Sequence, residues 1–222
     1  MPSETVEDYL KAIHAAEASL GDADALVPMG QVASALGVVP GTATTMVKAL
    51  ARSGLVRYEP YSGVRLTPAG TRLASLVVRR HRLVEQFLVQ MMGMSWADVH
   101  AEAERLEHAV SDRLIARIDE MLGHPSVDPH GDPIPDAAGS LAARAGRTLL
   151  SCPTGSRVRV LRVLDQDAAF LRFVEQHGLT PGEVVSIEAR DPAADRLRVR
   201  RADGSMFTLG AGAASKLVVG PA

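Results

Sequence analysis

Apolar residues in the first part of the chain recur with a helical period in three segments. Residues 4–20 keep apolar side chains three or four positions apart, which predicts one amphipathic helix. Residues 28–36 and 41–53 show the same period and predict two shorter helices, separated by a turn at residues 37–40. Two short helices joined by a tight turn are typical of a helix-turn-helix.

The period changes from helical to alternating after residue 53. Residues 54–59 and 64–67 alternate around a glycine-containing turn and predict a β-hairpin. A hairpin after three helices is the order of a winged helix, whose second motif helix enters the major groove while the hairpin lies along a phosphate backbone. The alternative is a winged helix used only for protein contacts. The candidate DNA contacts are Pro40, Gly41, Thr42, Thr44, Thr45 and Lys48 on the helix and Arg57, Tyr58, Tyr61 and Arg65 on the hairpin.

Longer helical segments follow the predicted hairpin. Residues 68–92 predict a long helix, with Thr67 as its N-cap and Pro68 as its first residue. Further helices are predicted at residues 96–108 and 111–122. The apolar face of residues 68–92 covers more surface than one small domain needs. We therefore expect burial against a second subunit in a homodimer, which suits a two-fold symmetric DNA site.

The last third of the chain has a different pattern. Residues 123–139 contain four prolines and predict a turn-rich connector. From residue 157 onward short alternating segments, and a hairpin turn at Asp203-Gly204, predict a small β-barrel. The predicted elements are strands at residues 157–163, 183–189, 196–200 and 205–209 and a helix at residues 170–177.

Composition narrows the class of protein. The chain is 46% hydrophobic but only 4% aromatic, and its one cysteine, Cys152, excludes an internal disulfide and a cysteine metal cluster. No signal peptide is recognisable and no apolar run approaches the ~20 residues of a membrane span, so we expect a soluble, cytoplasmic protein. Charge is segregated: residues 41–90 carry a net +6, residues 1–40 a net −5 and residues 91–143 a net −7. A basic block attracts a phosphate backbone, and an acidic block is neutralised by a cation.

The acidic block contains a pattern of metal-ligand residues. His100, Glu104, Glu107 and His108 fall within about a 100° arc of a helix, at 100° per residue. Imidazoles and carboxylates without a thiol suit a divalent cation such as Mn²⁺ or Fe²⁺. His81 and Glu85 repeat this chemistry at i and i+4. The alternative is a solvated helix face with weak surface pairs.

Four segments in order resemble the diphtheria-toxin-repressor family of metal-dependent repressors. They are TVEDYL at residues 5–10, RHRLVEQFL at 80–88, VHAEAERLEHAVSD at 99–112 and PHGDPIP at 129–135. The resemblance implies a mainly α protein with a small β domain. It implies a winged helix-turn-helix at residues 1–72, a helical dimerisation and metal-binding domain at 73–140, a linker at 141–152 and an SH3-like (FeoA-like) β-barrel at 153–222.

The resemblance also implies two metal positions. The first is Asp8, Glu104, Glu107 and His108, where the iron-sensing branch has Met and Cys in place of Asp8 and Glu104. Because oxygen ligands favour harder cations, we expect Mn²⁺, with Fe²⁺, Zn²⁺ or Co²⁺ as alternatives. The second position is His81, Glu85 and His100, with Asp167 of the β domain as a possible fourth ligand.

One departure changes the expected layout of the two ions. Compact manganese regulators of this family use a Glu where this chain has Lys11, and an ammonium group cannot be a ligand. We therefore expect two separated ions rather than a close pair. The remaining histidines, His14, His124, His130 and His177, are interpreted as ordinary surface or core residues.

The implied function is a manganese-dependent repressor of metal-homeostasis genes, whose dimer binds a double-stranded DNA operator when it is loaded with metal, with no organic cofactor and no membrane partner. An iron- or zinc-responsive repressor is the alternative within the family. A metal-dependent hydrolase is disfavoured, because Glu104-Arg-Leu-Glu-His108 lacks the second His of an inverted zinc-protease motif. A regulator that senses a small organic molecule is disfavoured by the low aromatic content.

Overall fold

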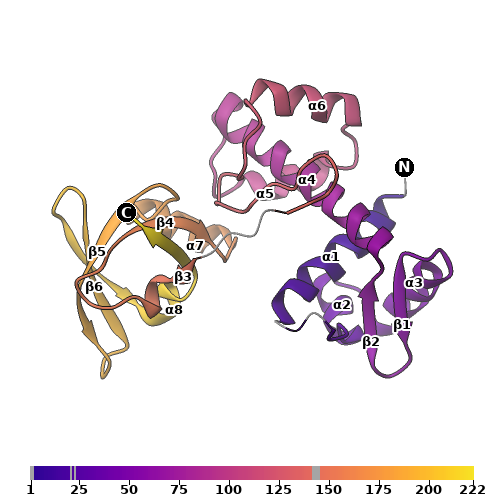
Figure 1. The fold of residues 1–222 in the computed structure, drawn as a ribbon, viewed down its shortest axis with the longest axis horizontal. Coiled ribbons are helices and arrows are strands. Elements are labelled where there is room, and N and C mark those ends of the chain that lie inside the picture. Colours follow the sequence, from indigo (N-terminus) through magenta and orange to yellow (C-terminus); the bar gives the residue numbers. More distant parts are fainter. Residues whose placement is uncertain (1–2, 21, 23, 142–145) are drawn as a thin grey trace. The chain divides into compact units, whose positions relative to one another are not determined.

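The computed structural model describes residues 3–20, 22, 24–141 and 146–222, and these form two units (Figure 1). Unit 1 comprises residues 1–81 and 135–141, and unit 2 comprises residues 82–134 and 142–222. The boundary between the units falls inside the long helix α4 (Pro68–Met92), so each unit is described by itself. Among the described residues, no helix combines the length and the apolar character needed to cross a bilayer.

Unit 1 is a winged helix, as the apolar period predicts. Its core is formed by inward-facing residues of all three short helices and the hairpin, among them Leu10, Ile13, Val32, Val47 and Val64. The hairpin strands are antiparallel, and Figure 1 shows them beside α3. The elements are α1 (Glu4–Leu20), α2 (Met29–Ala35), α3 (Pro40–Arg52), β1 (Val56–Glu59), β2 (Gly63–Leu66) and the first half of α4.

The predicted start of α4 is confirmed in detail. Pro68 is its first residue, and the hydroxyl of Thr67 accepts a hydrogen bond from the amide of Gly70 at 3.2 Å. This bond satisfies one of the amides that a helix start leaves without an intrahelical partner. Gly70 itself is required here, because a Cβ would lie 2.0 Å from the carbonyl oxygen of Leu55.

The helical part of unit 2 contains the second half of α4, α5 (Val99–Leu106) and α6 (Asp112–Met121) around a core that includes Leu83, Val84 and Ile118. The helix predicted at residues 96–108 is shorter at both ends. The hydroxyl of Ser95 accepts a hydrogen bond from the amide of Ala97 in a turn before α5. After α5 the chain turns, and the amides of Ala109 and Val110 both donate to the carbonyl oxygen of Leu106. Ser111 caps α6 by accepting from the amide of Leu114 at 3.3 Å.

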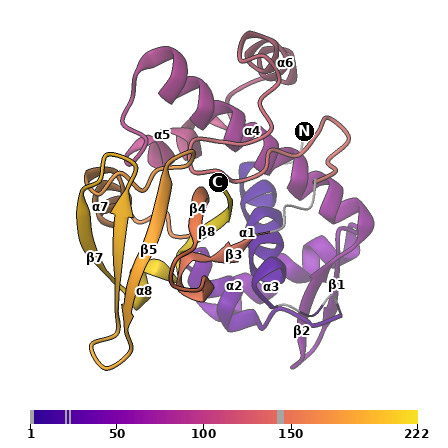
Figure 2. The same cartoon turned by 60° about the vertical axis from the view of Figure 1, so that its left-hand side comes forward.

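The rest of unit 2 is an antiparallel sheet of six strands in the order β3-β8-β4-β5-β6-β7. Figure 2 shows the two edge strands, β7 and β3, on opposite sides of this sheet. The four predicted strands and the predicted helix are present, and β6 and β7 form the hairpin expected at Asp203-Gly204. The elements are β3 (Arg147–Thr148), a 3-10 helix (Leu149–Ser151), β4 (Arg157–Val163), α7 (Ala168–Gln176), β5 (Val184–Asp191), β6 (Arg196–Arg201), β7 (Met206–Gly210), α8 (Ala211–Ala214) and β8 (Leu217–Pro221).

Two strands of this sheet were not expected. Strand β3 lies inside the predicted linker, of which residues 142–145 are outside the described residues, and it pairs with β8 through Arg147 and Val219. Strand β8 pairs with β4 along most of its length. Both strands are short, and neither shows the alternation of apolar and polar residues that predicts a strand. Their extended conformation depends on pairing within the folded sheet.

Candidate metal centres

Four of the predicted ligand residues form two contacting pairs on α5 and in the turn after it, within unit 2. Nε2 of His100 is 3.5 Å from Oε1 of Glu104, one helical turn away. Glu107 follows the last residue of α5 and is buried, and its Oε1 lies 3.4 Å from Nε2 of His108. The four residues therefore do not share one continuous helix as predicted, since Glu107 and His108 occupy the turn after α5. They still place imidazole and carboxylate groups side by side.

Glu85 links this set to α4. Its Oε1 lies 3.0 Å from Nδ1 of His100, and its side chain is fully buried. A carboxylate at one ring nitrogen fixes the orientation of a histidine ring and leaves the other nitrogen for a ligand. The predicted i, i+4 partner, His81, lies at the end of unit 1 in this division of α4.

A third group lies wholly within unit 2 and was not expected. Glu85, Asp128 and His130 are all buried, and each offers a ligand atom within 4.8 Å of the other two. Nε2 of His130 is 2.8 Å from the carbonyl oxygen of Trp96. A carbonyl oxygen can only accept a hydrogen bond, so Nε2 carries the proton of the neutral ring and Nδ1 carries a lone pair.

That lone pair faces other acceptors. Nδ1 of His130 lies 3.9 Å from Oε2 of Glu85 and, among the described residues, has no hydrogen-bond partner. Oδ2 of Asp128 likewise accepts no hydrogen bond from the described part of the chain, although Nε of Arg82 lies 3.6 Å away. Buried acceptors that face one another are unfavourable unless a proton or a metal cation lies between them. The arrangement therefore fits a divalent ion.

Electrostatics support this interpretation of the third group. Burial, together with the charges of Asp132 and Glu85, raises the pKa of Asp128 to about 8, against the lowering effect of Arg82. A positive charge held beside Asp128 would favour the carboxylate form and reverse this shift. A divalent ion at this position would therefore lower the pKa of Asp128 toward its ordinary range.

The loop that carries Asp128 and His130 is held in one conformation. Oδ1 of Asp128 accepts hydrogen bonds from the amides of His130 at 2.8 Å and Asp132 at 2.9 Å. Asp132 forms ion pairs with Arg82 of α4 and Arg162 of β4. This loop is thus tied both to the helical part and to the sheet of unit 2.

This group was not predicted, because His130 was interpreted as an ordinary surface or core histidine. His130 is a core residue, but its ring nitrogen points at carboxylates rather than at a hydrogen-bond donor. The signal in the sequence was the run Asp128-Pro-His-Gly-Asp132, which spaces three polar side chains at i, i+2 and i+4. The partner on α4 is 43 positions away in sequence, so periodicity could not reveal it.

The other predicted ligands have defined surroundings. Asp8 lies half-buried on α1 in unit 1. His81 is buried, with its Nδ1 3.4 Å from Nζ of Lys11. Asp167 caps α7, because its Oδ1 accepts from the amides of Ala169 and Phe170 at 3.0 Å each. The joint binding of one ion by Asp8 or His81 of unit 1 with residues of unit 2 stays a prediction.

The candidate DNA-contacting residues of α3 form an exposed helix start. Their side chains point outward with Thr44 half-buried, and the hydroxyls of Thr44 and Thr45 bond back to the carbonyls of Pro40 and Gly41. Within the described residues of unit 1, this surface presents small polar groups and the charge of Lys48. The exposed members are Pro40, Gly41, Thr42, Thr45 and Lys48.

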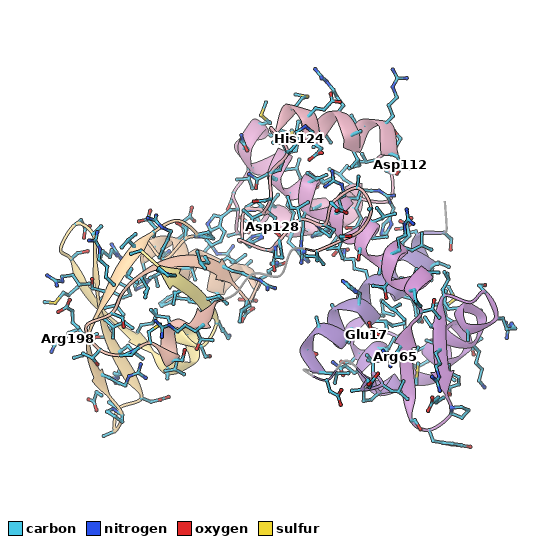
Figure 3. The ribbon with its side chains drawn as sticks, in the orientation of Figure 1. Glu17, Arg65, Asp112, His124, Asp128 and Arg198 are labelled. Atoms are coloured by element: carbon cyan, nitrogen blue, oxygen red, sulfur yellow. The ribbon has the colours of Figure 1, made fainter. Side chains whose placement is uncertain are left out.

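The candidate residues of the hairpin differ from one another. Tyr61 stands fully exposed at the turn, and Arg57 is exposed with a pair to Glu59 at 3.0 Å. Arg65 instead pairs with Asp24 at 3.1 Å, and Tyr58 packs against the core of unit 1 (Arg65 is labelled in Figure 3). Arg57 and Tyr61 are therefore the hairpin residues best placed to reach a phosphate.

Three family matches cover most of the chain. Residues 1–64 match the iron-dependent repressor N-terminal DNA-binding domain, residues 67–136 the iron-dependent repressor metal-binding and dimerisation domain, and residues 147–221 the FeoA domain.

Individual relatives agree with these matches. The chain is 31% identical over 198 residues to the iron-dependent repressor IdeR of Mycobacterium leprae, covering 83% of this chain and 84% of the relative. It is 36% identical over 122 residues to the regulator MntR of Lysinibacillus sphaericus, covering 55% and 84%. A solved manganese-dependent transcriptional repressor in complex with manganese is 41% identical, covers 98% of this chain and is itself covered completely, with a TM-score of 0.87.

These matches confirm the predicted winged helix, helical domain and SH3-like sheet domain, and they confirm a repressor rather than an enzyme. The chain belongs to the diphtheria-toxin-repressor family of metal-dependent transcriptional repressors.

Proposed function

We propose that this repressor is activated by Mn²⁺. The main support is that every candidate ligand atom is an oxygen or a nitrogen. The one thiol of the chain, that of Cys152, is buried in the core of the β domain, and its Sγ lies 3.5 Å from the carbonyl oxygen of Thr148. Carboxylate and imidazole ligands without thiolate suit Mn²⁺. The similarity to a manganese-bound repressor supports the same metal, whereas the similarity to IdeR keeps Fe²⁺ as the rival.

Two ligand groups follow from this proposal. The first is Asp8 with Glu104, Glu107 and His108, as the family resemblance implies. The second uses Glu85 with Asp128 and His130 in place of the predicted His81, Glu85, His100 and Asp167. The ammonium group of Lys11 beside His81 disfavours a cation there, and Asp167 is engaged as a helix cap.

The first group would couple metal to DNA. Asp8 belongs to the unit that contains α3, and Glu107 and His108 belong to the other unit. Without an ion, the carboxylates repel one another, and joint ligation restricts the two units to fewer relative orientations. Binding of metal and of operator must then strengthen each other by the same factor.

The test is operator binding under buffered free Mn²⁺, Fe²⁺, Zn²⁺ and Co²⁺, with operators selected from random duplexes separately for each metal. Mn²⁺ is expected to raise operator affinity by ~5- to 150-fold. Zn²⁺ is expected to bind at least as tightly, in line with the Irving–Williams order, so activation rather than affinity decides the metal. Activation by Fe²⁺ with none by Mn²⁺ would overturn the proposal.

The second group is tested by stoichiometry. Asp128→Asn is expected to bind one Mn²⁺ fewer per chain, measured from the free-ion signal in electron paramagnetic resonance. Trp96 is the only tryptophan, and its ring centroid lies 5.3 Å from that of His130, so Mn²⁺ bound beside His130 should quench its fluorescence. Asp128→Asn should lose this quenching. His81→Gln is the matched control, and a lost ion in that variant with full binding in Asp128→Asn would restore the originally predicted set.

We also propose that this chain forms the homodimer known for its family, through exposed apolar residues of the helical domain. Leu114 and Met121 of α6 are 50% and 47% exposed, although Ile115 and Ile118 of the same helix are buried. A Leu114→Glu/Met121→Glu variant is expected to be monomeric in sedimentation and to lose affinity for a two-fold symmetric operator. Arg117→Gln on the same helix should remain dimeric. A dimer in both variants would place the interface elsewhere.

A further inference from the structure

Strand β6 carries a row of arginines on one face. Arg196, Arg198 and Arg200 are exposed and alternate with Leu197 and Val199, which are buried in the core of the β domain. The alternation places three guanidinium groups on the outer side of the sheet, and Figure 3 labels Arg198 at the outer margin of this domain. Arg157 of β4 lies on the same side, because Arg157 and Arg200 both pair with Ser186 of β5. These four arginines form the basic sheet face.

The neighbours of the arginines on this face are mostly short. Arg198 lies between Ala189 of β5 and Thr208 of β7, and Arg196 lies opposite Gly210. Short side chains neither cover the guanidinium groups nor hold them away from a flat partner. The basic sheet face is therefore open to a ligand around Arg196 and Arg198.

The positive charge of this face is only partly compensated. Glu188 pairs with Arg200 at 2.7 Å, and Asp191 lies opposite Arg196 but accepts hydrogen bonds from the amides of Ala193 and Ala194. Across residues 3–20, 22, 24–141 and 146–222, no ion pair involves Arg157, Arg196 or Arg198. An exposed surface usually intersperses both signs, so a row of four arginines with one paired carboxylate favours an anionic partner.

We propose that the basic sheet face binds the phosphate backbone of duplex DNA, as a second DNA contact besides the winged helix. Arginine matches phosphate geometry through paired hydrogen bonds. Successive arginines on β6 are about 6.8 Å apart, a spacing on the scale of that between backbone phosphates of one strand. The face has no aromatic anchor and one large exposed apolar residue, Met206, which disfavours a lipid surface. The proposal rests on DNA being the partner of this chain, but not on which metal activates it.

The first test is the salt dependence of binding to a duplex that lacks the operator, with full-length protein. The Arg196→Gln/Arg198→Gln variant is expected to reduce the slope of log affinity against log salt by about 2, because each lost phosphate contact removes about 0.9. Affinity at low salt should fall about tenfold or more, equally for all sequences. The Mn²⁺ dependence of operator preference should be the same in the variant and the wild type. The metal proposal is tested in the wild-type protein, so its failure is distinguishable from failure of this proposal.

The matched control is Arg113→Gln/Arg117→Gln, which removes the same charge from α6 of the helical domain. It should keep the wild-type slope. An equal loss in both variants would mean that net charge alone is responsible and would overturn the proposal. An unchanged slope in Arg196→Gln/Arg198→Gln would also overturn it. So would loss of binding to phosphatidylglycerol-containing vesicles in that variant with DNA binding intact, because it would assign the face to membrane lipid.

The second test locates the contact directly. The native Cys152 is buried, so a single introduced cysteine can carry a photo-crosslinker. Thr208→Cys, next to Arg198, should crosslink to DNA. Gln176→Cys, exposed on α7 of the same domain, is the control and should not. Crosslinking from Gln176→Cys alone would place any DNA contact on the helix side of the domain and contradict the proposal.

Discussion

Glu107→Gln is expected to abolish most of the activation of operator binding by Mn²⁺. At a free Mn²⁺ concentration that saturates the wild-type protein, the variant should bind the operator ~5- to 150-fold more weakly. The substitution keeps the size of the side chain but removes its negative charge. Glu107 is buried next to His108, so no solvent-exposed carboxylate can replace it. Affinity for DNA without metal should be unchanged. The measurement is fluorescence anisotropy of a labelled operator at buffered free Mn²⁺.

The control for Glu107→Gln is Glu102→Gln. Glu102 lies on the same helix, with its side chain 42% exposed and paired with Arg105 at 3.0 Å. Surface pairs of this kind contribute little, so activation should be that of the wild type. If Glu107→Gln reached half-maximal operator binding at the same free Mn²⁺ concentration as the wild type, Glu107 would not be a metal ligand.

The prediction that Asp8 and Glu107 bind the same ion can be tested in the same assay. Asp8→Ala should lose activation like Glu107→Gln, and the double variant should be hardly worse than either single one. Residues that act through one bound ion are non-additive, whereas independent residues add. Additive losses from Asp8 and Glu107 would mean that they do not share an ion.

Gly131→Ala is expected to destabilise unit 2 by about 3 kcal/mol, among the larger effects of a single substitution. Gly131 has φ +87°, and a Cβ there would lie 2.0 Å from the carbonyl oxygen of Leu161 and 2.8 Å from Cα of Arg162. Both contacts are with the backbone of β4, which cannot rotate away. The loop with Asp128 and His130 would have to leave the sheet, so the Mn²⁺ quenching of Trp96 should weaken as well.

Gly123→Ala separates the cost of a left-handed φ from the cost of a steric clash. Gly123 also has a left-handed φ, +71°, but nothing lies within 4 Å of its Cβ position. Its cost should be about 1 kcal/mol, the usual penalty for alanine in this conformation. Urea unfolding followed by Trp96 fluorescence reports unit 2 for both variants. If both variants lost the same free energy of unfolding, the close approach of Gly131 to β4 would not contribute to the effect of Gly131→Ala.

Local signals account for the elements that were predicted well. The helical period of residues 4–20 and the Thr67-Pro68 start of α4 are confirmed to the residue. These features depend on side-chain spacing and on caps, which are properties of a few neighbouring residues. The helix at residues 96–108 was overestimated, because His108 keeps the polar spacing of α5 although the backbone has already turned.

Contacts between distant segments account for what was missed. Strand β3 exists because β8, about 70 positions later, offers it a partner. Glu85 and His130 are 45 positions apart, and only the packing of the loop against α4 turns the lone pair of His130 toward that carboxylate. Likewise, the arginines of β6 were visible as charges, but their common face and the lack of an ion pair at Arg196 and Arg198 depend on the sheet.

The sequence by itself determined the winged helix and the order of the domains, and it predicted a metal chemistry of oxygen and nitrogen ligands, since these depend on residue type and short-range spacing. The tertiary structure decided which histidine faces the buried carboxylates, which arginines remain without partners and where Cys152 is kept apart from the candidate ligands. These depend on burial, because only a folded core removes water from a polar group and leaves a cation as its best partner.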